Sequence, residues 1–222
     1  MTTLKLDYIM NKILVGTGNP SKFERYKRLL DTFDSIEAIS LTEIGKGVLP
    51  IIEDGDTAQE NATKKALTYS KATNLPTLSV DEALYIDAFP EADQPKTKVR
   101  RYKSDRDLTD EEMLERFTSS LKKLNLDETE VRWVFAICLA FPNGDVIFDE
   151  VEVKNIMTST LREPVLKGYP LSSILYDPTT KLSQSQFTKE DWDCYLKPIY
   201  YSVKGIIEKS ALLFRQEKNK LE

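Results

Sequence analysis

The chain of 222 residues contains no histidine. This absence excludes Ser-His-Asp and Cys-His nucleophile chemistry, a histidine general base and a zinc site with histidine ligands. The two cysteines, Cys138 in an apolar run and Cys194 beside Trp192, are too few for a disulfide framework and too far apart for a metal motif. We interpret both thiols as reduced and buried. The chemistry therefore has to use carboxylates, lysines, hydroxyls or a cation with oxygen ligands.

The sequence also lacks a run of about 18 apolar residues, and its N-terminus has no apolar stretch long enough for a signal peptide. We therefore expect a cytoplasmic protein with no membrane partner. With 31 basic and 36 acidic residues the net charge is -5, which argues against a nucleic-acid polymer as partner but leaves room for a small polyanion. An apolar content of 41% is enough for one large α/β domain or two small lobes.

Periodicity and turn residues give an alternation of strands and helices without repeats or a linker, which favours one continuous domain over residues 1–222. We expect an ordered loop or insertion at residues 89–103 and a loop-rich section at 161–186. The predicted strands are 12–16, 36–41, 77–80, 131–141, 146–153 and 155–158, with a hairpin turn at Pro142-Asn143-Gly144-Asp145. The predicted helices are 22–32, 57–73, 109–124 and 201–216.

The stretch "TGNPSK", residues 17–22, separates an apolar strand from a helix. A glycine-containing turn that opens a helix directs backbone N–H groups toward the positive end of the helix dipole, and phosphate binds readily there. Thr17, Asn19 and Lys22 add side-chain donors around Gly18. The same residues also fit an ordinary turn with a capping asparagine and a solvated lysine.

Acidic residues gather at two further places. Glu53 precedes the flexible Gly55, and Asp81 and Glu82 follow what we predict to be the end of an apolar strand. A hard divalent cation is typically bound by a few carboxylates together with water and phosphate oxygens, so these residues fit a metal site. The same residues also fit a solvated acidic loop and a helix cap without a metal. Asn61 and Lys65 are four residues apart and share a helix face, so Lys65 is a second phosphate ligand if that face looks toward Asp81.

Together these motifs resemble the inosine triphosphatase (HAM1-like) family of non-canonical purine nucleotide pyrophosphatases. The similar stretches are "TGNPSK" (17–22), "EDGDTAQENATKKA" (53–66), "VDEALYIDA" (80–88), "KTKVRRY" (96–102), "RWVFAICLAFPNGDVIFDEVEV" (132–153) and "LYDP" (175–178). They span nearly the whole chain, strongly to residue 88 and weakly after about 160.

The resemblance implies an α/β fold in which a long, twisted mixed sheet is flanked by helices and two lobes surround a central cleft. It implies hydrolysis of a nucleoside triphosphate to the monophosphate and pyrophosphate, with Mg²⁺, or Mn²⁺, as cofactor and a homodimer as the assembly. The residues it assigns to the phosphates are Thr17, Gly18, Asn19, Lys22, Asn61 and Lys65. It assigns the attacking water to Asp81 and the metal to Glu53. To these metal ligands we add Asp81 and Glu82 as expectations of our own.

Two segments depart from the family pattern, the first at the expected metal site and the second where the family reads the base. The usual Asp-Asp-Ser-Gly is Val80-Asp81-Glu82-Ala83, and the usual Ser-His-Arg is matched best by Ser202-Val203-Lys204-Gly205. An ammonium does not replace the planar fork of a guanidinium at a base edge. We therefore predict an altered or relaxed base preference, with base contacts from Tyr176, Asp177, Ser202 and Lys204.

Two other functions fit these departures. A nucleotide-binding or sensing protein on the same scaffold would bind without turnover. An enzyme for another phosphate ester, or for a modified pyrimidine nucleotide, would hydrolyse a different substrate.

Overall fold

The computed structural model describes residues 11–45 and 51–221. The strands are β1 (Lys12–Val15), β2 (Glu37–Ile39), β3 (Thr77–Ile86), β4 (Glu128–Ala140), β5 (Val146–Thr158) and β6 (Leu175–Tyr176). The longer helices are α2 (Pro20–Leu30), α3 (Ala58–Thr73), α4 (Asp110–Lys123) and α5 (Lys189–Leu221), and short 3-10 turns lie at Glu91–Asp93, Val99–Arg101, Pro170–Ser173 and Gln184–Gln186. No helix within the described ranges has the length and apolar content that crossing a bilayer requires.

The strands form one sheet in the order β2-β1-β3-β4-β5-β6. β1 runs parallel to β2 and β3, whereas β6 runs antiparallel to β5, so the sheet is mixed. The predicted α/β class with a mixed sheet and flanking helices is confirmed. By internal contacts the chain divides into unit 1 (1–81, 136–151 and 199–222) and unit 2 (82–135 and 152–198). The cleft between two lobes stays a prediction.

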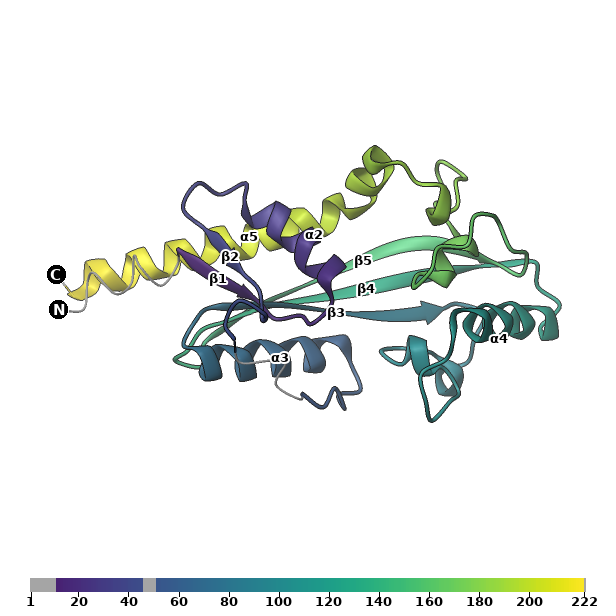
Figure 1. Ribbon diagram of the computed structural model, residues 1–222, viewed down its shortest axis with the longest axis horizontal. Helices are drawn as coiled ribbons and strands as arrows, with labels where there is room; N and C mark the ends of the chain where they lie inside the picture. The colour runs from purple at the N-terminus through teal and green to yellow at the C-terminus, as the bar shows by residue number, and fades with distance from the viewer. Residues whose placement is uncertain (1–10, 46–50, 222) are drawn as a thin grey trace. The chain divides into compact units, whose positions relative to one another are not determined.

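The first part of unit 1 consists of three parallel strands joined by two helices: α2 connects β1 to β2, and α3 connects β2 to β3. Because β2 and β3 flank β1 on opposite sides, right-handed connections place α2 and α3 on opposite faces of the sheet, as Figure 1 shows. Leu14 of β1, Leu41 and Tyr69 of α3 form a buried cluster there. The cluster packs β1 against the later half of α3.

The helices predicted at 57–73 and 109–124 are confirmed as α3 and α4. Thr57 and Glu60 form a capping box at the start of α3, and Thr109 and Glu112 form another at the start of α4. Each box pairs the threonine hydroxyl with a backbone N–H and the glutamate carboxylate with the backbone N–H of the threonine. The turn between β4 and β5 is also as predicted, with Gly144 at a φ of 96°.

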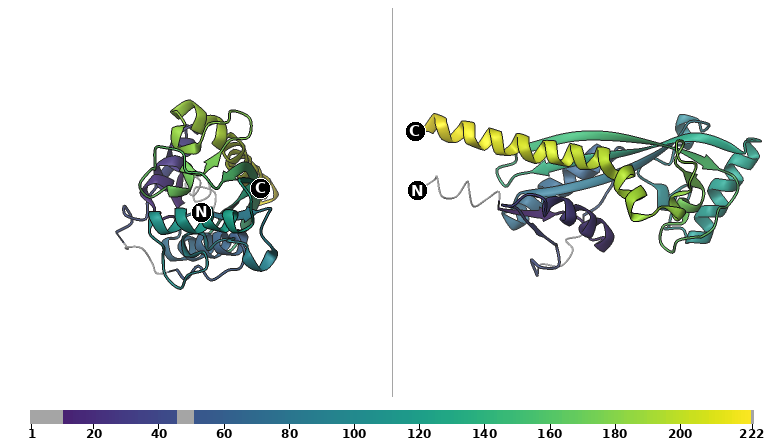
Figure 2. Two further views of the ribbon diagram at one scale, coloured as in Figure 1. Left: turned by 90° about the vertical axis from the view of Figure 1, so that its right-hand side faces the viewer. Right: turned by 90° about the horizontal axis from the view of Figure 1, so that it is seen from above.

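Several predicted boundaries are wrong. β3 does not end at residue 80 but continues to Ile86, so Asp81 and Glu82 lie inside a strand and not at its exit. Residues 155–158 continue β5, and α2 begins at Pro20 because proline fits the first helical position. α5 begins at Lys189 and passes through Pro198, and its length is visible in Figure 2. Cys194 is exposed, not buried.

Unit 2 has its own core, in which Tyr102 stacks between Phe89 and Phe117 with ring centroids 6.0 and 4.7 Å away. The segment 89–103, predicted as a loop or insertion, is ordered against β3. The side chain of Gln94 accepts from the N–H of Ile86 at 2.8 Å and donates to the carbonyl of Ile86 at 2.8 Å. A backbone bridge between Leu84 and Lys96 continues the contact.

A second anchor in unit 2 joins the start of α4 to the loop before Pro170. Arg100 donates to the carboxylate of Asp110 at 2.7 Å and to the carbonyl of Gly168 at 3.1 Å. The other carboxylate oxygen of Asp110 accepts from the N–H of Gly168 at 2.6 Å. The Arg100 guanidinium holds the pKa of Asp110 below its ordinary value, against the opposing effect of partial burial.

Arg100→Ala should lower the free energy of unfolding by about 1 kcal/mol at neutral pH, a figure that allows for the solvent screening of a partly exposed side chain. Arg101→Ala is the matched control, because the pair of Arg101 with Asp107 is largely exposed and should contribute less. The stabilisation by Asp110 should be complete above roughly pH 4 and be lost as the pH falls through its lowered pKa. Urea unfolding from pH 3 to pH 7 measures both effects, and a difference between wild type and Arg100→Ala that grows toward low pH would contradict this account.

Gly55→Ala should destabilise the protein by about 1–3 kcal/mol, because a Cβ there would lie 2.7 Å from Asn61 Oδ1 and 2.7 Å from Glu60 Cβ. Gly205→Ala is the control, since a Cβ at that helical position meets nothing within 4 Å and should stabilise α5 by up to about 1 kcal/mol. Thermal unfolding of the two variants measures the contrast. Equal effects of the two substitutions would contradict the close approach at Gly55.

Candidate active site

The loop after β1 is organised by Asn19, the N-cap of α2. Its side-chain oxygen accepts from the N–H of Ser21 at 2.9 Å and from that of Lys22 at 3.3 Å, while Thr17 Oγ1 accepts from the N–H of Asn19 at 3.1 Å. Two of the amides expected to be unpaired in this turn are therefore bonded to Asn19. Gly18 and Asn19 are exposed, and Thr17 and Lys22 are half-buried. A phosphate at this loop would meet these side chains and the turn around Gly18.

The acidic loop before α3 is bonded along its length to that helix. Asp54 pairs with Lys64 at 2.6 Å, and Glu53 pairs with Lys65 at 3.3 Å. Between them the N–H of Gly55 donates to Asn61 Oδ1 at 2.9 Å. Asn61 is 1% exposed, so in this arrangement its side chain holds the loop. Neighbouring positions on α3 thus fix where the Glu53 carboxylate can lie.

Lys65 and Asp81 form the most buried ion pair of this site. Lys65 Nζ lies 2.8 Å from Asp81 Oδ1, and the two side chains are 11% and 10% exposed. The face of α3 that carries Asn61 and Lys65 therefore looks toward Asp81 at Lys65, one of the two alternatives that the sequence left open. Burial acts to lower the pKa of Lys65, but the charges of Asp81 and Glu53 and their hydrogen bonds outweigh it, so this pKa is raised. The lysine is an ammonium across the physiological pH range.

Asp81 and Glu82 are consecutive residues in the middle of β3. Successive strand side chains point to opposite faces, so Glu82 faces away from the side that carries Asp81. Ser79 shares the face of Asp81, is 2% exposed, and its hydroxyl has no hydrogen-bond partner among the described residues. A buried hydroxyl of this kind is a place for a bound water.

The carboxylates of Glu53 and Asp81 both lie within 3.3 Å of one Lys65 nitrogen. Magnesium is usually bound by one or two carboxylates together with waters and phosphate oxygens, so this pair fits such a cation. Among the side chains that the structure describes, no three carboxylates or thiols come together as a metal cage. A cation here would need further oxygen ligands from a substrate or water.

The two predicted base contacts in unit 2 are engaged within the protein. The hydroxyl of Tyr176 donates to Glu128 Oε2 at 2.5 Å, and the guanidinium of Arg162 lies 4.2 Å from the centre of its ring. Burial, together with Glu128, raises the pKa of Tyr176. Asp177 Oδ1 accepts from the N–H groups of Thr179 and Thr180 at 2.8 and 2.7 Å, and so caps its own turn.

The two predicted base contacts on α5 lie two residues apart and therefore do not share a helix face. Ser202 donates to Asp149 Oδ2 at 2.6 Å, whereas Lys204 is exposed and lies 3.8 Å from Glu208. Asp149, Glu128 and Arg162 were missed by sequence reasoning. They reach their partners from distant parts of the chain, and no local pattern marks them.

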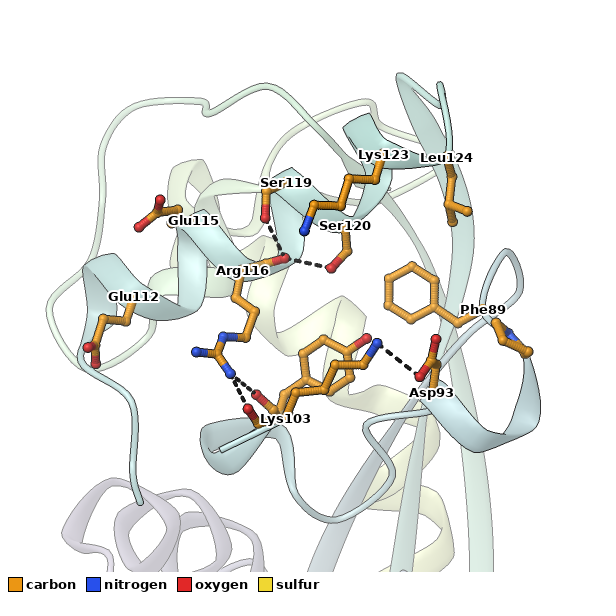
Figure 3. Close-up of a pocket in the computed structure, with 12 residues that line it drawn as sticks. Phe89, Asp93, Lys103, Glu112, Glu115, Arg116, Ser119, Ser120, Lys123 and Leu124 are labelled. Carbon is orange, nitrogen blue, oxygen red and sulfur yellow. Dashed lines mark hydrogen bonds and ion pairs between the residues drawn. The ribbon is translucent and has the colours of Figure 1, made fainter. Parts of the chain in front are cut away.

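Unit 2 has a cavity of about 660 Å³ lined by α4 and by residues 89–103. Figure 3 shows how the side chains that line it lie. Lys103 pairs there with Asp93 at 2.9 Å, and Arg116 donates to the backbone carbonyls of Tyr102 and Lys103. The lining carries three cationic and three acidic side chains and none of the predicted site residues. This balance gives no surplus of positive charge for a triphosphate.

Known proteins resemble this chain in sequence and in structure. Among relatives named dITP/XTP pyrophosphatase, the one from Oceanobacillus iheyensis is 30% identical over 139 residues, 63% of this chain and 68% of the relative. The one from Bacillus subtilis is 27% identical over 176 residues, 79% of this chain and 86% of the relative.

Two solved structures share the fold. The Ham1 protein of Staphylococcus aureus has a TM-score of 0.74 at 19% identity, covering 90% of this chain and 99% of that chain. A HAM1 protein from Coxiella burnetii has a TM-score of 0.73 at 22% identity, covering 89% and 98%. The model of the Ham1 family matches residues 13–191, which include every predicted site residue except Ser202 and Lys204. The chain therefore belongs to the Ham1 family.

Proposed function

We propose that this protein is a nucleoside-triphosphate pyrophosphatase that releases a nucleoside monophosphate and pyrophosphate. The observation that carries the proposal is the group of Lys65, Glu53 and Asp81, in which one buried ammonium meets two carboxylates. Phosphoryl chemistry needs fixed positive charge for the phosphates and a carboxylate for the attacking water, and this group has both. The dITP/XTP pyrophosphatase relatives in the Ham1 family support the same activity.

In the proposed reaction, water attacks the α-phosphorus and the bond from that phosphorus to the bridging oxygen breaks. The bridging oxygen leaves with pyrophosphate, and the proton of the water passes to Asp81 or to solvent. Asp81 orients the water, and Lys65 neutralises charge that develops on the phosphates. Lys22, Thr17, Gly18 and Asn19 hold the triphosphate at the start of α2, and Asn61 fixes the acidic loop.

A divalent cation, Mg²⁺ or Mn²⁺, is part of the proposal. The carboxylates of Glu53 and Asp81 would hold it, while Glu82, on the other face of β3, would need a different approach to join them. When bound, such a cation neutralises phosphate charge and polarises the phosphoryl oxygens.

An altered or relaxed base preference follows from the engaged base contacts. The hydroxyl of Tyr176 is bonded to Glu128, the carboxylate of Asp177 caps a turn, and Lys204 is exposed. None of these side chains replaces the paired N–H donors with which an arginine binds the edge of a base. Discrimination between bases depends on such paired hydrogen bonds. The roles of these residues, the homodimer and the cytoplasmic location stay predictions.

The second candidate is a nucleotide-binding or sensing protein without turnover. The observation that favours it is that Lys65 already pairs with Oδ1 of Asp81, so part of the acceptor capacity of this carboxylate is used within the protein. Binding of a nucleotide without hydrolysis would then be the whole function.

Incubation with Mg²⁺ and a panel of nucleoside triphosphates, including inosine and xanthosine forms of both sugars, should release pyrophosphate from at least one member. Asp81→Asn should lower the rate by roughly 10²–10⁴-fold, the usual contribution of a positioned acid or base. Asp105→Asn is the control, because Asp105 is exposed and should leave the rate unchanged. Coupled detection of pyrophosphate measures all three proteins.

The same panel separates the two candidates. Tight binding by calorimetry without pyrophosphate from any nucleotide would favour the sensing protein. Hydrolysis that survives Asp81→Asn would overturn the role assigned to Asp81.

A further inference from the structure

Lys65 is bonded to the two carboxylates that we propose as cation ligands. Its Nζ lies 2.8 Å from Asp81 Oδ1 and 3.3 Å from Glu53 Oε1. The Lys65 and Asp81 side chains are nearly buried, whereas the Glu53 side chain is 49% exposed. The ammonium thus lies between the two carboxylates and offsets part of their charge, and water reaches it and Asp81 poorly.

We propose that the Lys65 ammonium and a divalent cation compete for the Glu53–Asp81 pair, so that the pair takes the cation in exchange for Lys65 and the triphosphate drives the exchange. This inference rests on the proposed function for the identity of the triphosphate. Its core, the competition between ammonium and metal, depends on the three side chains alone.

Charge explains why the two occupants exclude each other. The pair carries two negative charges, which one ammonium already offsets in part. A dication added beside the ammonium would bring three positive charges against two negative ones at close range, where poor solvation weakens screening. The cation therefore binds well only when Lys65 leaves, and Lys65 leaves a nearly buried position only for another anion.

A triphosphate is such an anion. Lysine is a compact charge on a flexible stem, so Lys65 can turn from the carboxylates to a phosphate without movement of α3. The vacated oxygens of Glu53 and Asp81 then meet the cation that travels with the nucleotide. Nucleotide and cation should accordingly strengthen each other's binding, and by linkage the factor is the same in both directions.

The direct test measures the affinity of the full chain for Mn²⁺ without nucleotide. Electron paramagnetic resonance reports the concentration of unbound Mn²⁺ during the titration. Lys65→Met should bind Mn²⁺ roughly tenfold or more tightly than wild type, within the usual range of coupling between sites. Lys65→Arg keeps a positive charge between the carboxylates and should stay as weak as wild type. Lys64→Met is the matched control: it removes the neighbouring exposed pair with Asp54 and should change Mn²⁺ affinity by less than about twofold.

Mn²⁺ binding by Lys65→Met that is equal to or weaker than that of wild type would overturn the competition. Equal tightening by Lys64→Met would also overturn it, because the effect would then come from loss of any lysine. Since Lys65→Met leaves Asp81 without its cation, thermal unfolding must confirm that the variant is folded.

A second measurement uses wild type alone and does not depend on that variant. A triphosphate analogue with a methylene bridge between the α- and β-phosphorus cannot release pyrophosphate, and it should raise Mn²⁺ affinity roughly tenfold beyond the Mn²⁺ bound by the analogue itself. If the analogue left the affinity of the protein for Mn²⁺ unchanged, the proposed exchange of Lys65 for the cation would be overturned. Tightening by Lys65→Met in a protein that hydrolyses no nucleotide would instead support the competition while the proposed activity fails.

Discussion

The ion pair between Lys65 and Asp81 is the constraint on which the candidate site depends. It joins the middle of α3 to the middle of β3, with both side chains close to nine-tenths buried. A buried charge that loses its partner costs several kcal/mol, so helix and strand have to stay in the register that keeps the two together. The capping box at Thr57 and the bond from Gly55 to Asn61 then bring the acidic loop to the same lysine.

This dependence separates the residues proposed to bind the phosphates from those predicted to contact the base. Lys65, Glu53 and Asp81 are fixed by contacts within unit 1, mostly over short stretches of chain. The predicted base contacts are distributed between unit 1 and unit 2 and are bonded to other protein groups. Ser202 and Lys204 also lie beyond the residues that match the Ham1 family. A site of this kind can keep its phosphate chemistry while its choice of base changes.

The sequence predicted what local signals determine. Thr57 with Glu60, and Thr109 with Glu112, mark helix starts because each pair lies within a single turn. The length of β3 was missed because Asp81 and Glu82 interrupt its apolar pattern. The charge of Asp81 is offset inside the strand by Lys65, which lies 16 positions away along the chain. The start of α5 was missed because Pro198 lies inside the helix. The bonds of Ser202 to Asp149 and of Tyr176 to Glu128 join residues 53 and 48 positions apart, which no local pattern shows.

The clamp of Gln94 on Ile86 has a consequence for solubility. Among the residues that the structure describes, β1 pairs with β3 at Thr77 and Leu78, near the start of that strand, and its later half continues beyond this pairing. Gln94 and the bridge from Lys96 to Leu84 bond to the backbone of this later half. An uncovered strand edge invites pairing with another chain. The segment 89–103 therefore closes this stretch of the strand edge with the chain's own groups, so that the backbone of Leu84 and Ile86 is not open to such pairing.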